Sequence, residues 1–176
     1  MWIIILIIII IILLIYFLMQ NSEIKSVPDV DINKYLGVWY EIARLPASFE
    51  QNCKNSMATY SLKTTYPNLS IGVINTCDIN GRQISIQGTA IPANNTQLIA
   101  GTSILSPGEL LVSFGNDFSP YNINYVDNNY QYAIVSSNRD KFWILSRNPQ
   151  VDNYTYQSLV SIANKLGFDT RNLIKN

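Results

Sequence analysis

The pattern of hydrophobic and polar positions divides the chain into three parts. Residues 2–19 are 18 consecutive apolar residues, most of them Ile and Leu, and residues 20–28 are a short polar stretch. From about Asp29, short runs of alternating apolar and polar residues are separated by turn signals every 8–14 residues. This spacing is typical of an antiparallel barrel or sandwich. We therefore interpret residues 20–28 as a spacer and residues 29–176 as one domain.

The N-terminal run is long enough to matter for localisation. As a helix it would extend about 27 Å, close to the roughly 30 Å hydrocarbon core of a bilayer. It is longer than the apolar part of a cleaved signal peptide. The residues at its C-terminal end (17–22) lack an Ala-x-Ala cleavage pattern. We favour a transmembrane signal anchor over residues 1–19, with the domain held on the non-cytoplasmic side of a membrane. The alternative is a cleaved signal peptide and a secreted domain.

Eight strand-like runs follow the spacer. Asn80 and Gly81 separate two of them and give the strongest hairpin signal in the chain. The runs cover residues 38–45, 54–63, 69–79, 83–91, 110–114, 122–126, 130–136 and 141–146. We interpret residues 97–105 as an extended connection between the fourth and fifth runs.

After Pro149 the apolar positions recur at helical spacing between Tyr156 and Leu166. Asp152 or Asn153 can cap the start of this helix, and Gly167 can end it in a left-handed turn. An eight-stranded antiparallel sheet can remove its edges by closing. The prediction is an all-β fold, an eight-stranded antiparallel up-and-down barrel with one C-terminal α-helix packed outside, preceded by an N-terminal hydrophobic helix.

Composition excludes several classes of function. Twelve basic and 12 acidic residues give no net charge, and the absence of a basic stripe argues against nucleic acid as a partner. The chain has no histidine, which rules out Ser-His-Asp and Cys-His catalysis and removes the commonest metal ligand. Two cysteines are too few for a structural zinc site. We expect no enzymatic activity, no metal and no cofactor.

The two cysteines are placed for a disulfide. Cys53 begins the second run and Cys77 ends the third, each twelve residues from the turn near Thr65. They should lie opposite each other, where Cα atoms about 4.5–5.5 Å apart permit a bond. Export across a membrane favours the bond over two reduced thiols. A register error of one residue would prevent it.

Three separated segments carry a resemblance to a known family. They are Gly37-Val38-Trp39-Tyr40-Glu41-Ile42-Ala43-Arg44, Tyr130-Gln131-Tyr132-Ala133-Ile134-Val135 and Lys141-Phe142-Trp143-Ile144-Leu145-Ser146-Arg147-Asn148-Pro149. Together with the ending at residues 167–174 they resemble the lipocalins, above all the bacterial outer-membrane, plant temperature-induced and apolipoprotein D group. The resemblance covers about residues 29–176. Two features depart from it: Val126-Asp127-Asn128-Asn129-Tyr130 stands where the family has Thr-Asp-Tyr, and no cysteine follows the apolar run.

The resemblance implies structural roles for Gly37, Trp39 and Arg147. Trp39 would close the floor of the barrel, and Arg147 would lie across its ring and donate to backbone carbonyls. The implied function is non-catalytic binding or transport of a small hydrophobic ligand, with a fatty acid or lysophospholipid first and a retinoid, sterol or tetrapyrrole next. Two alternatives are a protein-interaction module with a filled barrel, and a lipocalin-fold isomerase or synthase with Cys53 as a free cavity thiol.

The lining of the cavity follows from strand alternation. If Trp39 points inward, a period of two places Glu41 and Ala43 on the same face. An inward carboxylate is costly unless it is paired, so we expect Arg44 or backbone groups to satisfy Glu41 outside the cavity. The aromatic candidates from the other runs are Tyr60, Phe114, Tyr125, Tyr132 and Trp143.

Overall fold

The computed structural model describes residues 2–20, 23–65, 67–94, 98–101 and 103–176, without the side chains of residues 3, 15–20 and 98–100. Helix α1 (Trp2–Gln20) covers the N-terminal apolar run. Within the part of the chain that is described, no helix is long and apolar enough to cross a membrane. The structure therefore does not support the expected transmembrane signal anchor.

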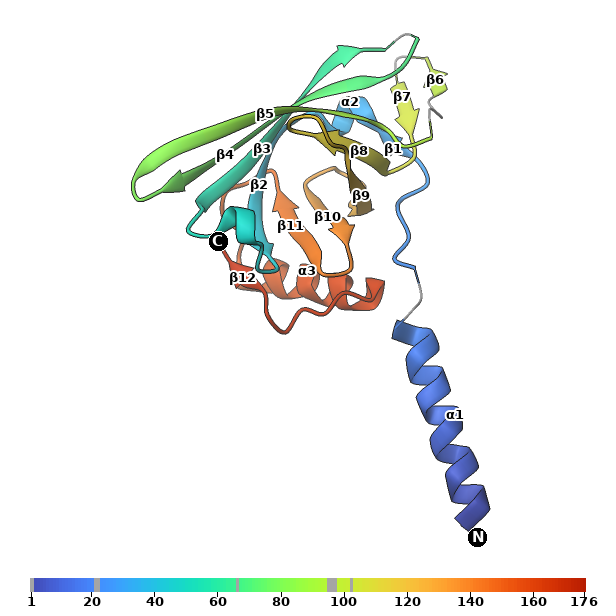
Figure 1. Ribbon diagram of the computed structural model, residues 1–176. Coiled ribbons are helices and arrows are strands. Elements are labelled where there is room, and N and C mark those ends of the chain that lie inside the picture. Colours follow the sequence, from blue (N-terminus) through green and yellow to red (C-terminus); the bar gives the residue numbers. More distant parts are fainter. Residues whose placement is uncertain (1, 21–22, 66, 95–97, 102) are drawn as a thin grey trace.

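The eight expected runs form a closed antiparallel barrel (Figure 1). Each strand pairs with its neighbour in the chain, and the last strand pairs with the first through Trp143 opposite Arg44. Closure removes the free edges that an open sheet would expose. The predicted fold is confirmed. The strands are β2 (Gly37–Arg44), β3 (Lys54–Thr64), β4 (Ser70–Ile79), β5 (Arg82–Pro92), β8 (Glu109–Ser113), β9 (Ser119–Val126), β10 (Tyr132–Asn138) and β11 (Lys141–Ser146).

The segment expected to be an extended connection is instead a hairpin outside the barrel. Strands β6 (Leu98–Ala100) and β7 (Ser103–Ser106) pair with each other, and β7 also pairs with β1 (Val30–Asp31). Residue 97, where the expected connection begins, lies outside the described residues. The short helix α2 (Ile32–Tyr35) follows β1 and leads into β2. A short strand, β12 (Ile174–Lys175), adds to β2 near the C-terminus.

Helix α3 (Asn153–Leu166) packs outside the barrel, as expected (Figure 1). The Asp152 carboxylate accepts a hydrogen bond from the Thr155 amide at 2.9 Å, and Gly167 ends the helix in the left-handed region at φ 100°. Both are established helix-end signals. The buried stripe of α3, Leu159 and Ala163, contacts the outer face of β10 and β11 in one apolar cluster.

The alternation of β2 reverses at a bulge. Leu145 pairs with Glu41 and Ile144 pairs with Ala43, so Ile42 is an extra residue in β2. A bulge of this kind shifts the following residues to the opposite face. Ile42 and Ala43 both join the outer cluster under α3. The expectation that Ala43 lines the interior is therefore corrected.

Candidate ligand-binding cavity

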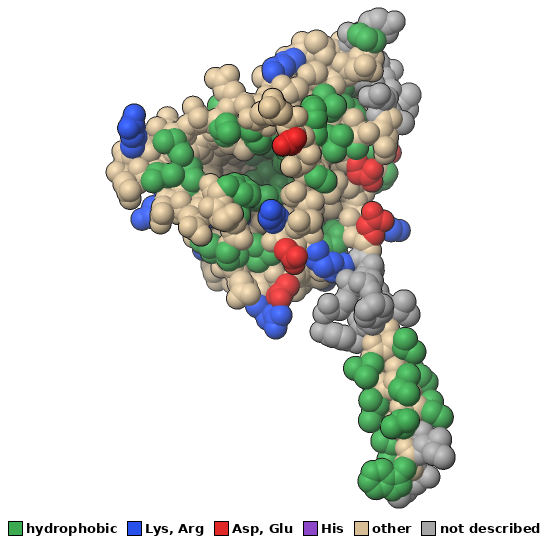
Figure 2. All heavy atoms as spheres, viewed as in Figure 1, with side chains coloured by type: hydrophobic (Ala, Val, Ile, Leu, Met, Phe, Trp, Pro, Cys, Tyr) green, Lys and Arg blue, Asp and Glu red, His purple; other side chains and the backbone are tan. Residues whose placement is uncertain are grey.

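The barrel encloses a cavity of about 700 Å³. Its walls come from all eight barrel strands and from the short helix η1 (Ser48–Glu50). Figure 2 shows the opening as a hollow among hydrophobic side chains, with charged side chains at its edge. Sites for small molecules commonly have volumes of about 300–1,000 Å³ with mostly apolar walls. The cavity has the size and character of a small-molecule site.

Trp39 and Tyr35 close one end of the barrel. Trp39 is fully buried, its ring centre lies 5.1 Å from that of Tyr35, and its Nε1 donates to the Tyr35 carbonyl at 2.8 Å. The guanidinium of Arg147 lies over the Trp39 ring, 3.8 Å from its centre. Such a stack adds about 0.5–2 kcal/mol, depending on how far the cation is desolvated. Partial burial lowers the pKa of Arg147 from its ordinary value.

Arg147 holds the segment around α2 by its hydrogen bonds. Its side chain donates to five backbone carbonyls at 2.7–3.2 Å, those of Lys34, Tyr35, Leu36, Val38 and Tyr130. Gly37 passes beside it with φ 94°, and a Cβ there would stand 3.4 Å from Arg147 Nη1. This backbone conformation favours glycine. Gly37 and Arg147 thus fasten α2 to the closed end.

Three tyrosine hydroxyls meet at the closed end of the cavity. The Tyr60 hydroxyl donates to that of Tyr121 at 2.8 Å, and the hydroxyls of Tyr35 and Tyr121 are also 2.8 Å apart. Desolvation raises the pKa of Tyr60 to about 12, and burial also raises the pKa values of Tyr35 and Tyr121. All three remain neutral phenols. Tyr60 and Tyr121 line the cavity.

The predicted lining residues separate into two groups. Tyr60, Phe114 and Trp143 line the cavity. Tyr125 and Tyr132, together with Ala43, pack in the outer cluster under α3 instead. In β10 the inward position belongs to Ala133, one residue after Tyr132. In β9 a register shift at Asn124 separates inward Ile123 from outward Tyr125.

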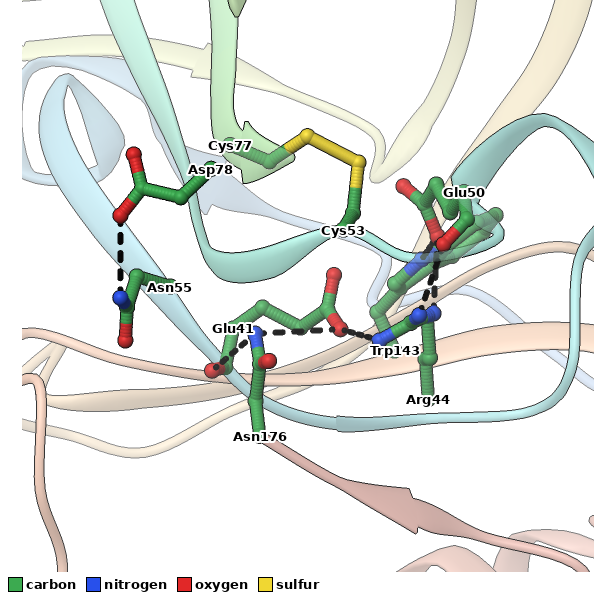
Figure 3. Close-up of a disulfide and its surroundings, with 9 residues drawn as sticks. All are labelled: Glu41, Arg44, Glu50, Cys53, Asn55, Cys77, Asp78, Trp143 and Asn176. Carbon is green, nitrogen blue, oxygen red and sulfur yellow. Dashed lines mark hydrogen bonds and ion pairs between the residues drawn. A yellow bond between two sulfur atoms is a disulfide. The ribbon is translucent and has the colours of Figure 1, made fainter. Parts of the chain in front are cut away.

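A buried ionic cluster stands at the cavity wall near the disulfide (Figure 3). Arg44 Nη1 donates to Glu41 Oε1 at 2.8 Å, and Arg44 Nη2 donates to the Glu50 carbonyl at 2.9 Å. The Trp143 indole donates to Glu50 Oε2 at 3.0 Å. Arg44 does pair with Glu41, as expected, but Glu41 lines the cavity rather than lying outside it. Desolvation, aided by the charge of Glu50, raises the pKa of Glu41 to about 7, and Arg44 opposes this shift.

Cys53 and Cys77 form a disulfide, with Cα atoms 5.4 Å apart. This prediction is confirmed. The bond joins the start of β3 to the end of β4, and both cysteines lie in the cavity wall (Figure 3). Because the chain has only two cysteines, the disulfide leaves no free thiol to act as a nucleophile.

The cavity wall also carries polar atoms that lack protein partners. Within the described residues, Ser56 Oγ and Asn75 Oδ1 are buried without a hydrogen bond, and both residues line the cavity. Polar atoms of this kind can bond a ligand or water. No group of three or more His, Cys, Asp or Glu side chains in the described part of the chain could hold a metal ion.

The sequence interpretation missed two members of the tyrosine cluster, Tyr35 and Tyr121. Tyr121 lies in β9, which starts at Ser119, whereas the pattern indicated a strand beginning at Asn122. Its spacing of two from Ile123 was the signal that could have found it. Tyr35 lies on the short helix α2, outside the strands. No periodicity of apolar residues in the sequence indicates that its side chain points inward.

A closed antiparallel barrel with an outer helix and an apolar interior cavity defines a class of small-molecule-binding barrel proteins. A family model described as a lipocalin-like domain matches residues 30–176. R877 of Acanthamoeba polyphaga mimivirus, named as a lipocalin, is 51% identical over 176 residues and all of both chains. Outer membrane lipoprotein Blc of Vibrio cholerae is 33% identical over 87% of this chain and 85% of its own. The chain belongs to the lipocalin family, whose members bind small hydrophobic ligands.

Structural comparison supports the same fold. Insecticyanin from the tobacco hornworm Manduca sexta superimposes with a TM-score of 0.65 over 88% of this chain and 84% of its own, at 23% identity. Temperature-induced lipocalin-1 of Arabidopsis thaliana is similar in sequence, with 31% identity over 90% of this chain and 84% of its own. The group that the three sequence segments indicated is thus confirmed.

Proposed function

We propose that the protein binds and carries a small hydrophobic molecule in the barrel, without catalysis. The observation that supports this is the largely apolar cavity of about 700 Å³ above the Trp39 floor. A sixteen-carbon chain has about 14 methylenes, each worth about 0.8 kcal/mol when buried, a ceiling near 11 kcal/mol. Association costs several kcal/mol, so we expect dissociation constants near micromolar.

Fatty acids and lysophospholipids are the first ligands to test, followed by retinoids, sterols and tetrapyrroles. The cavity volume supports the binding function over a filled barrel that only presents loops to a protein. The disulfide argues against an isomerase or synthase that uses a cysteine thiol, because both cysteines of the chain form the disulfide.

The test is a titration of the full chain, purified without detergent because alkyl detergents would compete for the cavity. A fluorescent fatty acid is added while tryptophan emission is followed, and unlabelled lipids then displace the probe. Ala58→Phe is the matched variant, since Ala58 lines the cavity and a larger side chain fills it. We expect one saturable site that A58F weakens. A folded sample that binds none of these lipid classes would overturn the proposal.

We propose further that α1 holds the barrel at a membrane surface. The described side chains of α1 are apolar and largely exposed, from Ile10 at 47% to Trp2 at 84%, and apolar surface of this extent favours contact with lipid. The Blc relatives are named as outer membrane lipoproteins. Cell fractionation of the full chain and of a variant lacking residues 2–19 tests this: the full chain should sediment with membranes, and the shortened chain should not.

A further inference from the structure

The tyrosine hydroxyls at the closed end contain more hydrogen-bond donors than they use. Tyr35, Tyr60 and Tyr121 supply three hydroxyl protons. Two O···O contacts of 2.8 Å join them, with Tyr121 in the middle. Each contact uses one proton, so one O–H has no acceptor within the cluster. An O–H left without an acceptor in a desolvated site is costly, and the site therefore favours an acceptor from outside the protein.

The position of Tyr121 makes the spare donor accessible from the cavity. Tyr60 donates to Tyr121, and when Tyr35 does the same the oxygen of Tyr121 accepts both bonds and its own proton is free. Tyr121 lines the cavity, whereas Tyr35 is buried behind it at 1% exposure. In this arrangement the free donor faces the ligand space. Donation from Tyr121 to Tyr35 would instead leave the spare proton on the buried Tyr35, so an acceptor in the cavity selects the first arrangement.

The surroundings of the hydroxyls favour a neutral acceptor over a carboxylate. Val73 and Ala90, which line the cavity, belong to the same interior apolar cluster as Tyr60. Arg147, a cation at this end, lies on the Trp39 ring and donates to backbone carbonyls. An anion brought here would lose its hydration for one neutral hydrogen bond. The raised pKa of Tyr60 has the same cause, since burial disfavours negative charge.

We propose that the closed end of the cavity recognises the neutral oxygen of an apolar ligand, such as a hydroxyl, ketone or ester carbonyl, through the hydroxyl of Tyr121. This inference rests on the proposed binding function and specifies its ligand class. A long-chain alcohol, ketone or sterol bearing such an oxygen at its leading end binds with that end inward, and the rest of the molecule fills the apolar barrel.

The experiment compares two chain-matched probes, 2-decanone and 1-chlorodecane, as competitors of the neutral fluorophore N-phenyl-1-naphthylamine bound to the full chain. The ratio of their affinities removes the contribution of apolar burial, which the two share. The variant is the triple substitution Tyr35→Phe, Tyr60→Phe, Tyr121→Phe. It removes all three hydroxyls, so none is left without a hydrogen-bond partner. The control is Tyr125→Phe, because Tyr125 packs in the outer cluster.

We expect the ketone-to-chloride affinity ratio to fall about three- to tenfold in the triple variant, the equivalent of one hydrogen bond. Tyr125→Phe leaves the ratio unchanged. The carbonyl stretch of ¹³C-labelled 2-decanone should also shift to lower frequency in the wild type than in the triple variant.

An unchanged ratio with an unshifted carbonyl stretch would overturn this inference and leave the binding function intact. Failure of the fluorophore and of every competitor to bind the folded wild type would instead overturn the proposed function itself.

Discussion

Arg147 places its guanidinium 3.8 Å from the ring centre of Trp39. Trp39 lies on the first barrel strand, β2, and Arg147 follows the last, β11, so the contact joins the two strands that close the barrel. The same guanidinium donates to carbonyls on both sides of Gly37. One side chain therefore supports both barrel closure and the attachment of α2.

Replacing Arg147 should destabilise the barrel. Arg147→Ala removes the ring contact and leaves several carbonyls without donors, and we expect a loss of about 3 kcal/mol in the free energy of unfolding. Arg147→Lys should recover only part of this, because an ammonium lacks the planar fork. Urea unfolding followed by circular dichroism measures both. Arg82→Ala, at an exposed site, serves as the control, and equal midpoints for all variants would contradict the role given to Arg147.

Removing the disulfide should lower stability without abolishing the fold. The bond closes a segment of 24 residues, for which chain entropy predicts a contribution of about 3 kcal/mol. Cys53→Ser with Cys77→Ser should therefore lower the urea midpoint of the oxidised protein. The double variant should no longer respond to dithiothreitol, whereas the wild type should. A wild type that is equally stable with and without reductant would show that the bond contributes nothing.

Gly88 is predicted to tolerate no side chain. A Cβ at this position would stand 2.4 Å from the Ser113 carbonyl and 2.7 Å from Phe114 Cδ1. Gly88→Ala must push β8 away from β5, at a cost of about 1–3 kcal/mol. It should also weaken ligand binding, because Phe114 lines the cavity. Gly115→Ala is the matched control, since no described atom lies within 4 Å of its Cβ. Similar thermal midpoints for the two variants would argue against the close approach.

The alternation of apolar and polar residues along the chain was sufficient to predict the barrel strands and their order. The β4–β5 pairing has no register shift, and the β3–β4 pairing is regular from Met57 to Leu62. In these stretches a period of two assigns the faces correctly. Tyr60 and Trp143 were placed by this reasoning on the strands where they line the cavity. The two cysteines do form the expected disulfide. Cys53 precedes β3, however, and the register shifts between Lys54 and Met57, so regular alternation alone does not place the two cysteines opposite each other.

Bulges caused the errors in the predicted site. Ile42 and Asn124 are extra residues in their strands, and each reverses the alternation that follows, so Ala43 and Tyr125 turn outward. A bulge depends on the register against the neighbouring strand, which no single segment of sequence contains. The start of β9 was placed three residues late. The missed part contains Pro120, a residue uncommon inside strands, which pairs with Leu111.

Glu41 should make stability depend on pH in an unusual direction. Its pKa is raised to about 7 in the folded chain, mainly by desolvation and next by Glu50, whereas a glutamate in the unfolded chain titrates near 4.3. Between about pH 4.5 and 7 the folded state therefore binds the additional proton. Stability is highest at the low end of this window and falls as pH rises toward 7, by at most about 4 kcal/mol.

Urea unfolding of the wild type and of Glu41→Gln across pH 4.5–8 measures this slope. Glutamine keeps an oxygen for Arg44 but does not titrate, so the variant should lose the decline between pH 4.5 and 7. Glu23→Gln, an exposed glutamate outside the cavity lining, should behave like the wild type. If stability instead rises with pH through this window and E41Q does not alter the slope, then Arg44 holds Glu41 ionised and the buried pair is a permanent ion pair.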